Sequence, residues 1–260
     1  MKKSIVAILV LLILCSTALY SQPLSAGLAR SMTLNGATGL IVVPDGHVAW
    51  EESKFGVDVG YGFVWGGGNR FDHLPRAVVS LFNIWEVSVL FHIGDDYFKN
   101  LVLGSKVKIF NKGGTAMAIG GDFEFSGEHY TGNSSKIYLA TTYGGSFFNM
   151  PAVTTATIGW QLLESGRFSS QFIYGMGFSL GLFGDNLNNI LYWVTDFANF
   201  SYAVQGSIVN SGYRGAFNTG LRIRPFQKGR FNMIIDIMGT DLLDDGGRGL
   251  NLSVSGGMAF

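Results

Sequence analysis

Hydrophobic and polar residues alternate along most of the chain. In the segment 55–65, a large apolar residue stands at every second position, with glycine, Asp58 and Val64 between them. Successive side chains of a strand point to opposite faces, so this period of two predicts strands with two unlike faces. The alternation recurs about twelve times, although ten or fourteen strands would also fit. The predicted strands are 55–66, 74–83, 84–94, 99–110, 114–126, 135–147, 151–163, 167–183, 196–208, 214–225, 230–241 and 248–260.

The two faces differ in an unusual way. One carries aromatic and aliphatic residues, whereas the other is rich in Gly, Ala and Ser. The polar face of a water-soluble sandwich meets solvent, and such small residues suit it poorly. Large apolar residues outside and small polar ones inside are typical of a transmembrane barrel. We therefore predict an all-β, antiparallel, up-and-down barrel of about 12 strands, with a soluble secreted β-sandwich as the rival fold.

Composition narrows the class of protein further. The chain has 260 residues, of which 47% are hydrophobic and only 14% charged, against about 25% charged in a typical soluble domain. Its 18 basic and 18 acidic residues leave no positive excess for binding nucleic acid. A single cysteine excludes a disulfide scaffold. The numbers favour a β-protein with little solvated surface.

The first 22 residues have the pattern of a secretory signal. Lys2 and Lys3 precede an apolar run over 5–14, and small or polar residues lead to a cleavage point near Ser21. A retained anchor is the alternative interpretation, and a lipid attached at Cys15 is disfavoured by the large residue before it. We divide the chain into a cleaved signal peptide (1–22), a periplasmic or lumenal lead segment (23–54) and an outer-membrane barrel (55–260).

The connections between predicted strands alternate in length. Tight turns are expected at 83–84, 111–114, 148–151 and 227–229, and longer links at 66–73, 94–100, 126–134 and 240–249. Short periplasmic turns and longer outer loops follow if both termini face the periplasm. One link, 184–195, is long where a short turn is due. It predicts either a small helix or an irregularity.

Ten charged residues fall on the inward face of this arrangement, five basic and five acidic. In a water-filled pore, opposed charges create a transverse field that filters small solutes. Alternatively, they pair across a narrow lumen and act as a plug. Twelve strands lie between filled eight-stranded and open sixteen-stranded barrels, and the inward glycines favour some free space, so we predict a narrow channel. The lumen-lining charges are Asp58, Arg76, Glu86, Lys106, Lys108, Asp122, Glu124, Arg222, Arg224 and Asp236.

The C-terminus resembles the assembly signal of bacterial outer-membrane barrels. The last strand is amphipathic and ends in phenylalanine, with Leu252, Val254, Met258 and Phe260 on one face. This resemblance implies insertion into the lipid of the cell outer membrane by the barrel-assembly machinery.

The run Gly36-Ala-Thr-Gly-Leu-Ile-Val-Val-Pro-Asp-Gly46, followed by Phe55-Gly56, resembles the opening of YjbH-like outer-membrane proteins. That family is associated with exopolysaccharide production, so the resemblance implies a non-conducting accessory role in surface polysaccharide export. The chain departs from the family pattern at Val43 and Asp45, where small residues are usual. Taken by themselves, these residues predict either a turn entering the first strand or a segment tucked into the lumen.

No group of residues predicts catalysis, a metal or a cofactor. The four histidines, at positions 47, 73, 92 and 129, are scattered over different segments and lack the spacing of a metal site. No nucleophile, base and orienting residue fall together on predicted strands. The predicted function is therefore non-enzymatic, a porin-like conduit for small solutes.

Overall fold

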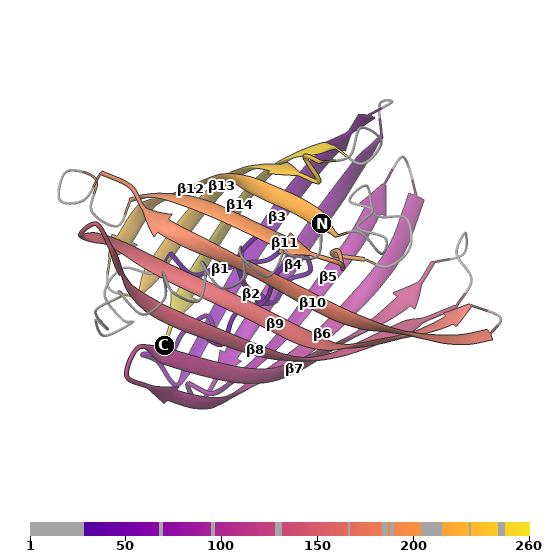
Figure 1. The fold of residues 1–260 in the computed structure, drawn as a ribbon, viewed down its shortest axis with the longest axis horizontal. Coiled ribbons are helices and arrows are strands. Elements are labelled where there is room, and N and C mark those ends of the chain that lie inside the picture. Colours follow the sequence, from indigo (N-terminus) through magenta and orange to yellow (C-terminus); the bar gives the residue numbers. More distant parts are fainter. Residues whose placement is uncertain are drawn as a thin grey trace, which may run out of the picture.

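Twelve antiparallel strands close into a single barrel (Figure 1). The computed structural model describes residues 29–67, 70–94, 97–127, 132–165, 167–183, 187, 190–203, 215–228, 230–243 and 248–260. The predicted signal peptide lies outside these residues. Each strand pairs with the next along the chain, and β14 pairs with β3 to complete the cylinder. The barrel strands are β3 (Phe55–Gly66), β4 (Phe71–Leu81), β5 (Trp85–Gly94), β6 (Tyr97–Lys112), β7 (Thr115–Ser126), β8 (Ser134–Phe147), β9 (Met150–Ser165), β10 (Arg167–Gly181), β11 (Leu191–Ala198), β12 (Ala216–Lys228), β13 (Phe231–Thr240) and β14 (Gly249–Ala259).

The predicted all-β, twelve-stranded barrel is confirmed. Closure gives every strand a partner on both edges, which satisfies the backbone groups that lipid would leave without hydrogen bonds. Two further short strands, β1 (Ser31–Met32) and β2 (Thr38–Gly39), form a separate two-stranded sheet. Among the described residues, no helix is long and apolar enough to cross a membrane.

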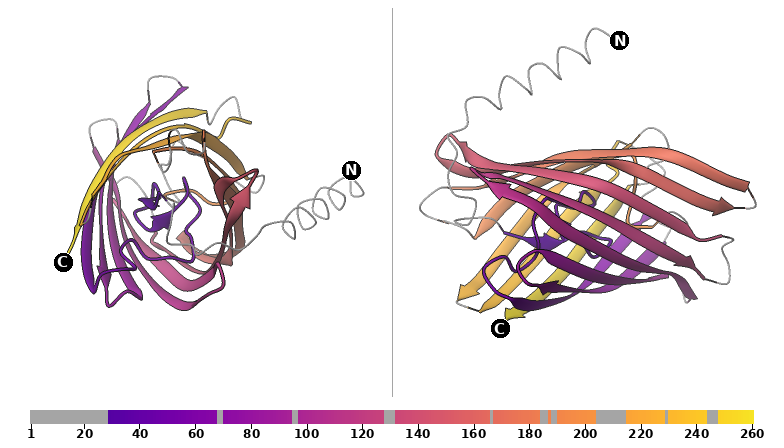
Figure 2. Two further views of the ribbon diagram at one scale, coloured as in Figure 1. Left: turned by 90° about the vertical axis from the view of Figure 1, so that its left-hand side faces the viewer. Right: turned by 90° about the horizontal axis from the view of Figure 1, so that it is seen from below.

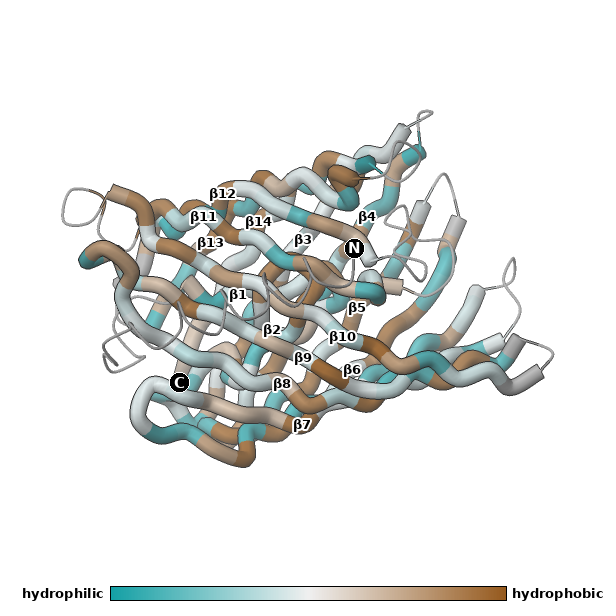
Figure 3. The backbone as a smooth tube through the Cα atoms, viewed as in Figure 1, coloured by the Kyte–Doolittle hydropathy of each residue, from teal (hydrophilic) through white to brown (hydrophobic). Residues whose placement is uncertain are grey.

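Large apolar side chains cover the outside of the barrel. Hydrophobic and hydrophilic positions alternate along the strands (Figure 3). On β3, Val59 and Trp65 are more than half exposed, whereas their neighbours Asp58 and Val64 are buried. These aromatic and aliphatic side chains do not pack against a second sheet, so the soluble sandwich is excluded. Their solvent is hydrocarbon.

Tight turns connect the strands at the end of the barrel where the chain terminates. Phe82-Asn83 and Phe148-Asn149 each link two strands, and all four residues have positive φ values between 48° and 64°. Tight turns of type I′ require positive φ at both central positions, which asparagine tolerates but phenylalanine normally avoids. The predicted turns at 83–84 and 148–151 therefore fall where expected.

The prediction fails around β11. The predicted strand 196–208 is wrong, because β11 spans Leu191–Ala198 and the chain then turns inward. Asn199 ends the pairing with β10: its Oδ1 accepts from the Tyr174 N–H at 2.7 Å, and its Nδ2 donates to the Phe172 carbonyl at 2.9 Å. The predicted link 184–195 is wrong for the same reason. Tyr192 and Val194 face the lumen although they are apolar, which hides the alternation. The predicted link 94–100 is also too long, since β6 begins at Tyr97.

The described part of the lead segment lies inside the barrel. In the left view of Figure 2, the indigo N-terminal chain runs through the middle of the ring of strands. We refer to residues 29–51 as the lumen segment. Leu34, Val42 and Val43 in this segment are at most 2% exposed. They join the buried cluster of inward side chains such as Val194 and Ala198.

Candidate functional site: the filled lumen

Arg222 on β12 binds the lumen segment through three backbone carbonyls. Its Nη1 donates to the carbonyls of Ala29 at 3.2 Å and Gly39 at 3.1 Å, and its Nη2 donates to that of Leu40 at 2.9 Å. The Arg222 Nε donates to Asp236 on the neighbouring strand at 2.8 Å. The guanidinium is almost completely buried, and this carboxylate balances its charge. The arginine thus joins two separate turns of the segment to the wall.

Asp196 on β11 also binds the lumen segment, but through a negatively charged acceptor instead of a positively charged donor. One oxygen, Oδ2, accepts from three consecutive backbone N–H groups, those of Ile41, Val42 and Val43, at 2.8–3.0 Å. Successive N–H groups that converge in this way form a concave anion site, or nest. Asn218 donates to the other oxygen at 2.7 Å. The carboxylate is fully satisfied although it is buried.

Glu86 and Lys106 bind the middle of the segment from β5 and β6. Glu86 accepts from the Thr38 N–H at 2.8 Å, from the Thr38 hydroxyl and from the Ala49 N–H at 3.2 Å. Lys106 donates to the Thr38 carbonyl at 2.8 Å and lies 3.4 Å from Glu86 and from Asp45. A charged residue of each sign therefore contacts the same short strand, β2.

Charged groups also fix the end of the segment next to β3. The Trp50 indole N–H donates to Asp58 at 2.6 Å. Glu51 lies 2.9 Å from each of Arg30, His47 and Lys108. Burial alone would raise the pKa of Glu51, but the hydrogen bond from His47 and the charges of its basic neighbours together hold that pKa below its usual value.

The ten predicted lumen-lining charges all lie on the inner side of the wall. Seven of them contact the lumen segment directly, and they are Asp58, Glu86, Lys106, Lys108, Asp122, Arg222 and Asp236. In this group, Asp122 accepts from Asn35 at 2.9 Å and Asp236 from Ser31 at 3.3 Å. The charges therefore do not face one another across a water-filled space. They bind residues 29–51 of the same chain.

The remaining three inward charges have other surroundings. Arg224 donates to the Tyr192 hydroxyl at 3.0 Å, and Glu124 accepts from Ser134 at 3.1 Å. Arg76 is buried, and its Nε and Nη1 have no hydrogen-bond partner. The missing side chain of Gly62 leaves room for this guanidinium, since a β-carbon there would lie 2.7 Å from Nη1.

The inward glycines do not leave the free space expected from the sequence. A β-carbon at Gly56 would lie 2.3 Å from the Trp50 ring, and one at Gly175 would lie 2.7 Å from Val43 Cγ2. Both positions allow the lumen segment to approach the wall closely. Glycine therefore serves packing here, rather than widening a channel.

A second inward element narrows the lumen from the loop end. We refer to residues 199–203, which follow β11, as the strap. The Tyr202 hydroxyl donates to Asp72, which also accepts from Lys99 at 2.7 Å. The His92 ring stacks edge-on against Tyr202 at 5.3 Å. This buried cluster of β4, β5 and β6 side chains holds the strap inside the barrel.

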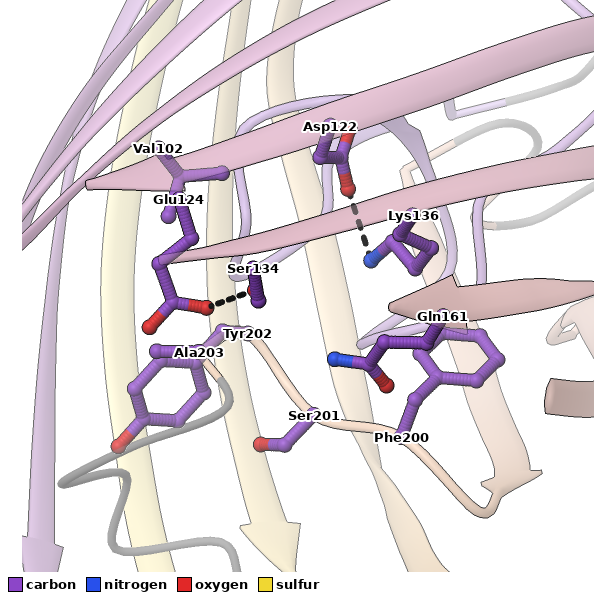
Figure 4. A pocket seen from close by; sticks show the side chains of 10 residues that line it. All are labelled: Val102, Asp122, Glu124, Ser134, Lys136, Gln161, Phe200, Ser201, Tyr202 and Ala203. Carbon is purple, nitrogen blue, oxygen red and sulfur yellow. Dashed lines mark hydrogen bonds and ion pairs between the residues drawn. The ribbon is translucent and has the colours of Figure 1, made fainter. Parts of the chain in front are cut away.

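A small polar cavity lies between the strap and strands β6–β9 (Figure 4). Lys136 projects into it, 2.7 Å from Asp122 and 5.0 Å from the centre of the Phe200 ring. Gln161 and Ser201 contribute further polar groups. The volume is about 20 Å³, which is room for roughly one water molecule. Larger solutes do not fit at this point.

Sequence reasoning missed several residues of the lumen. The pattern places Asp196 at the start of a predicted strand rather than on the inner wall, and it does not distinguish Lys136 or the strap residue Tyr202 from their neighbours. For Lys136 a signal was present, since it pairs in register with Asp122. For Tyr202 there was none, because its aromatic ring looks like a lipid-facing residue.

The C-terminal residues lie on the outer wall. Leu252, Val254 and Phe260 are about half exposed, and Met258 shares their strand. The Phe260 ring lies 5.6 Å from that of Phe55 at the closing edge of the barrel.

In the described ranges, no three His, Cys, Asp or Glu residues are grouped closely enough to hold a metal ion.

A closed, twelve-stranded cylinder with an apolar exterior and charged interior defines an integral outer-membrane β-barrel protein. Among solved structures, the NanC porin matches with a TM-score of 0.54 and 10% identity over 78% of this chain and 100% of the porin. The KdgM porin gives a TM-score of 0.46 at 8% identity, over 78% of this chain and 99% of that one. Omp33 of Acinetobacter baumannii gives 0.44 at 11% identity, over 80% and 98%. No protein-family model and no curated protein matches the sequence. At such identities, the NanC match establishes the likeness of fold alone.

Proposed function

We propose that the protein is a narrow, porin-like conduit for small solutes in the outer membrane. The observation that carries this proposal is the character of the inner wall. Asp58, Glu86, Asp122 and Asp236 stand on strands whose outer faces are apolar, and basic residues stand among them. These charges bind residues 29–51 here, but ionisable side chains on an inner wall can also be solvated by water and act on the ions and polar solutes that pass. The NanC porin, which shares the fold, supports the same function.

The accessory role in surface polysaccharide export is not favoured. It depends on the resemblance of residues 36–46 to YjbH-like proteins, and no family model supports that resemblance. In the structure these residues make contacts inside the barrel, with Arg222 and Asp196 on the wall. The described histidines contact structural partners: His92 contacts Asp72 and Tyr202, His47 contacts Glu51, and His73 contacts Tyr61, whereas His129 lies outside the described residues.

The partners of this function are membrane lipid on the outer wall and a small polar solute in the lumen. We propose that the barrel-assembly machinery recognises the last strand through Leu252, Val254, Met258 and Phe260, three of which are widely exposed. The signal peptide at 1–22 remains the proposed route of export.

Single-channel recording in planar lipid bilayers tests the conduit. The purified full chain should produce discrete conductance steps, and deletion of residues 33–45 should enlarge the average current because it removes most of the filling. Neutralising Arg224 to Gln should alter ion selectivity, since this buried cation lies on the inner wall beside Tyr192. A folded barrel that passes no current in either the full or the deleted form would disprove the conduit.

A further inference from the structure

The lumen segment occupies the middle of the barrel, and most of its side chains are buried there. It is hydrogen-bonded to wall residues on β3, β5, β6, β7, β11, β12 and β13, among them Glu86, Asp196 and Arg222. Between the strap and strands β6–β9, the cavity has room for about one water molecule. If small solutes pass through the barrel, the segment has to leave part of this position.

We propose that residues 29–51 are a gate that moves away from the wall while the barrel stays closed. The proposal rests on the proposed conduit and adds its regulation. Three side chains act as the latch: Glu86, Asp196 and Arg222. Residues 52–54, which join the segment to β3, serve as the hinge, and Glu52 and Lys54 in this stretch are exposed.

The chemistry of the covered wall supports a gate over a permanent plug. A permanently buried surface is stabilised at least as well by apolar side chains, because burying ion pairs carries a desolvation penalty. Here the covered wall keeps Glu86, Lys106, Arg222 and Asp236, each at most 4% exposed. Such groups are costly under a fixed plug but well solvated once water replaces the segment. The wall is therefore compatible with both a covered and a wet state.

The latch contacts are also of a kind that water can replace. Asp196 binds only backbone N–H groups of the segment, and Arg222 binds only its backbone carbonyls. Arg222 keeps its ion pair with Asp236, which lies on the wall, when the segment leaves. Asp196 likewise keeps the hydrogen bond from Asn218. Release thus exposes paired charges to water instead of leaving isolated ones.

A reversible cross-link tests the gate in the full chain. The only cysteine of the sequence is Cys15, in the predicted signal peptide, so an engineered pair reacts without competition in the processed protein. Val43→Cys with Gly175→Cys is suited to this, because Val43 Cγ2 lies 2.7 Å from the position of a β-carbon at Gly175. The oxidised protein should show at least a tenfold lower open probability than the same protein after reduction. The two single-cysteine variants are the controls and should not respond to reductant.

Weakening the latch is the second arm. Asp196→Asn keeps the shape of the side chain but loses the charge that three N–H groups share, and it should raise the open probability at least tenfold. Glu164→Gln is the control, because it removes the charge of an exposed carboxylate near the end of β9, outside the latch and the ten lumen-lining charges. It should leave the open probability within twofold of the unchanged protein.

The outcomes separate the gate from the conduit itself. Equal currents before and after reduction of the cysteine pair, with the disulfide verified by mass spectrometry, would overturn the gate. So would currents that appear only after deletion of residues 33–45, since the segment would then be a permanent plug in a barrel able to conduct. Absence of current in every form, including the deletion, would instead remove the conduit on which the gate rests.

Discussion

The two faces of the same strands obey different physical requirements, and β12 and β13 show this most directly. Leu221 pairs with Ile237, and the next pair in the ladder is Arg222 with Asp236. The first pair is about 40% exposed on the outer wall, whereas the second is at most 4% exposed and binds the lumen segment. The outer wall needs only apolar bulk, so many sequences satisfy it. The inner wall needs specific partners at specific positions.

We expect the largest fall in the free energy of unfolding when a charge of the inner wall is removed. Arg222→Met leaves Asp236 buried without its partner and removes the donors to three carbonyls of the segment. We expect the free energy of unfolding to fall by about 3–5 kcal/mol. Urea titration of the protein in lipid vesicles, followed by tryptophan fluorescence, measures it. The double variant Arg222→Met/Asp236→Leu should recover part of the loss, and a single variant as stable as the unchanged protein would refute the role of the pair.

A charge on the outer wall should cost somewhat less. Val59 lies near the middle of β3 and is 59% exposed. Val59→Arg places a cation in hydrocarbon and should lower the free energy of unfolding by roughly 2–4 kcal/mol in vesicles. Val59→Leu is the control and should change it little. If the arginine variant is as stable as the leucine variant, this face does not contact lipid.

Disturbing the close packing between the lumen segment and the wall should lower the free energy of unfolding by an intermediate amount. Gly56→Ala puts a β-carbon 2.3 Å from the Trp50 ring. Such overpacking typically costs about 1–3 kcal/mol, and the same urea titration would detect it. Gly67→Ala is the matched control, because no heavy atom lies within 4 Å of a β-carbon there. Adding Trp50→Leu should relieve the strain of the first variant, and a failure to do so would contradict the packing described.

The smallest expected effect is a dependence of the stability on pH through Glu51. The pKa of Glu51 is lowered in the folded state, so its ionised form stabilises the fold above the ordinary carboxyl pKa, and this contribution is lost as the pH falls through the lowered value. The stability difference between the unchanged protein and Glu51→Gln should therefore stay constant from about pH 7 to about pH 5 and shrink below about pH 4. Urea midpoints at several pH values test this. A difference that grows in acid would have the wrong sign.

The contrast between the walls also explains what could be predicted from the sequence. The outer wall repeats one simple requirement at every second residue, so strand β3 is predicted with its observed bounds of Phe55–Gly66. The alternation fails where the inner wall becomes apolar. Tyr192 and Val194 face the lumen segment, and the pattern of β11 is lost as a result.

The inward position of the charges also follows from alternation, but their partners do not. Nothing in the spacing of Glu86 and Thr38 indicates that one binds the other, because the contact depends on how residues 29–51 turn inside the barrel. The strap cannot be predicted from the sequence for a related reason. Phe200 and Tyr202 are buried inside the lumen, and an aromatic residue there looks the same in the sequence as one that faces lipid.

The seam between the first and last barrel strands has a consequence for biogenesis. β14 is the last barrel strand in sequence, and it closes the cylinder against β3, which follows the lumen segment in sequence. Residues 29–51 can first reach their wall partners more easily before the cylinder is closed than by entry from one end of the finished barrel. The simplest order of assembly has the curved sheet fold around the segment while the seam is still open. The lumen would then be filled and the barrel closed in a single event, when β14 pairs with β3.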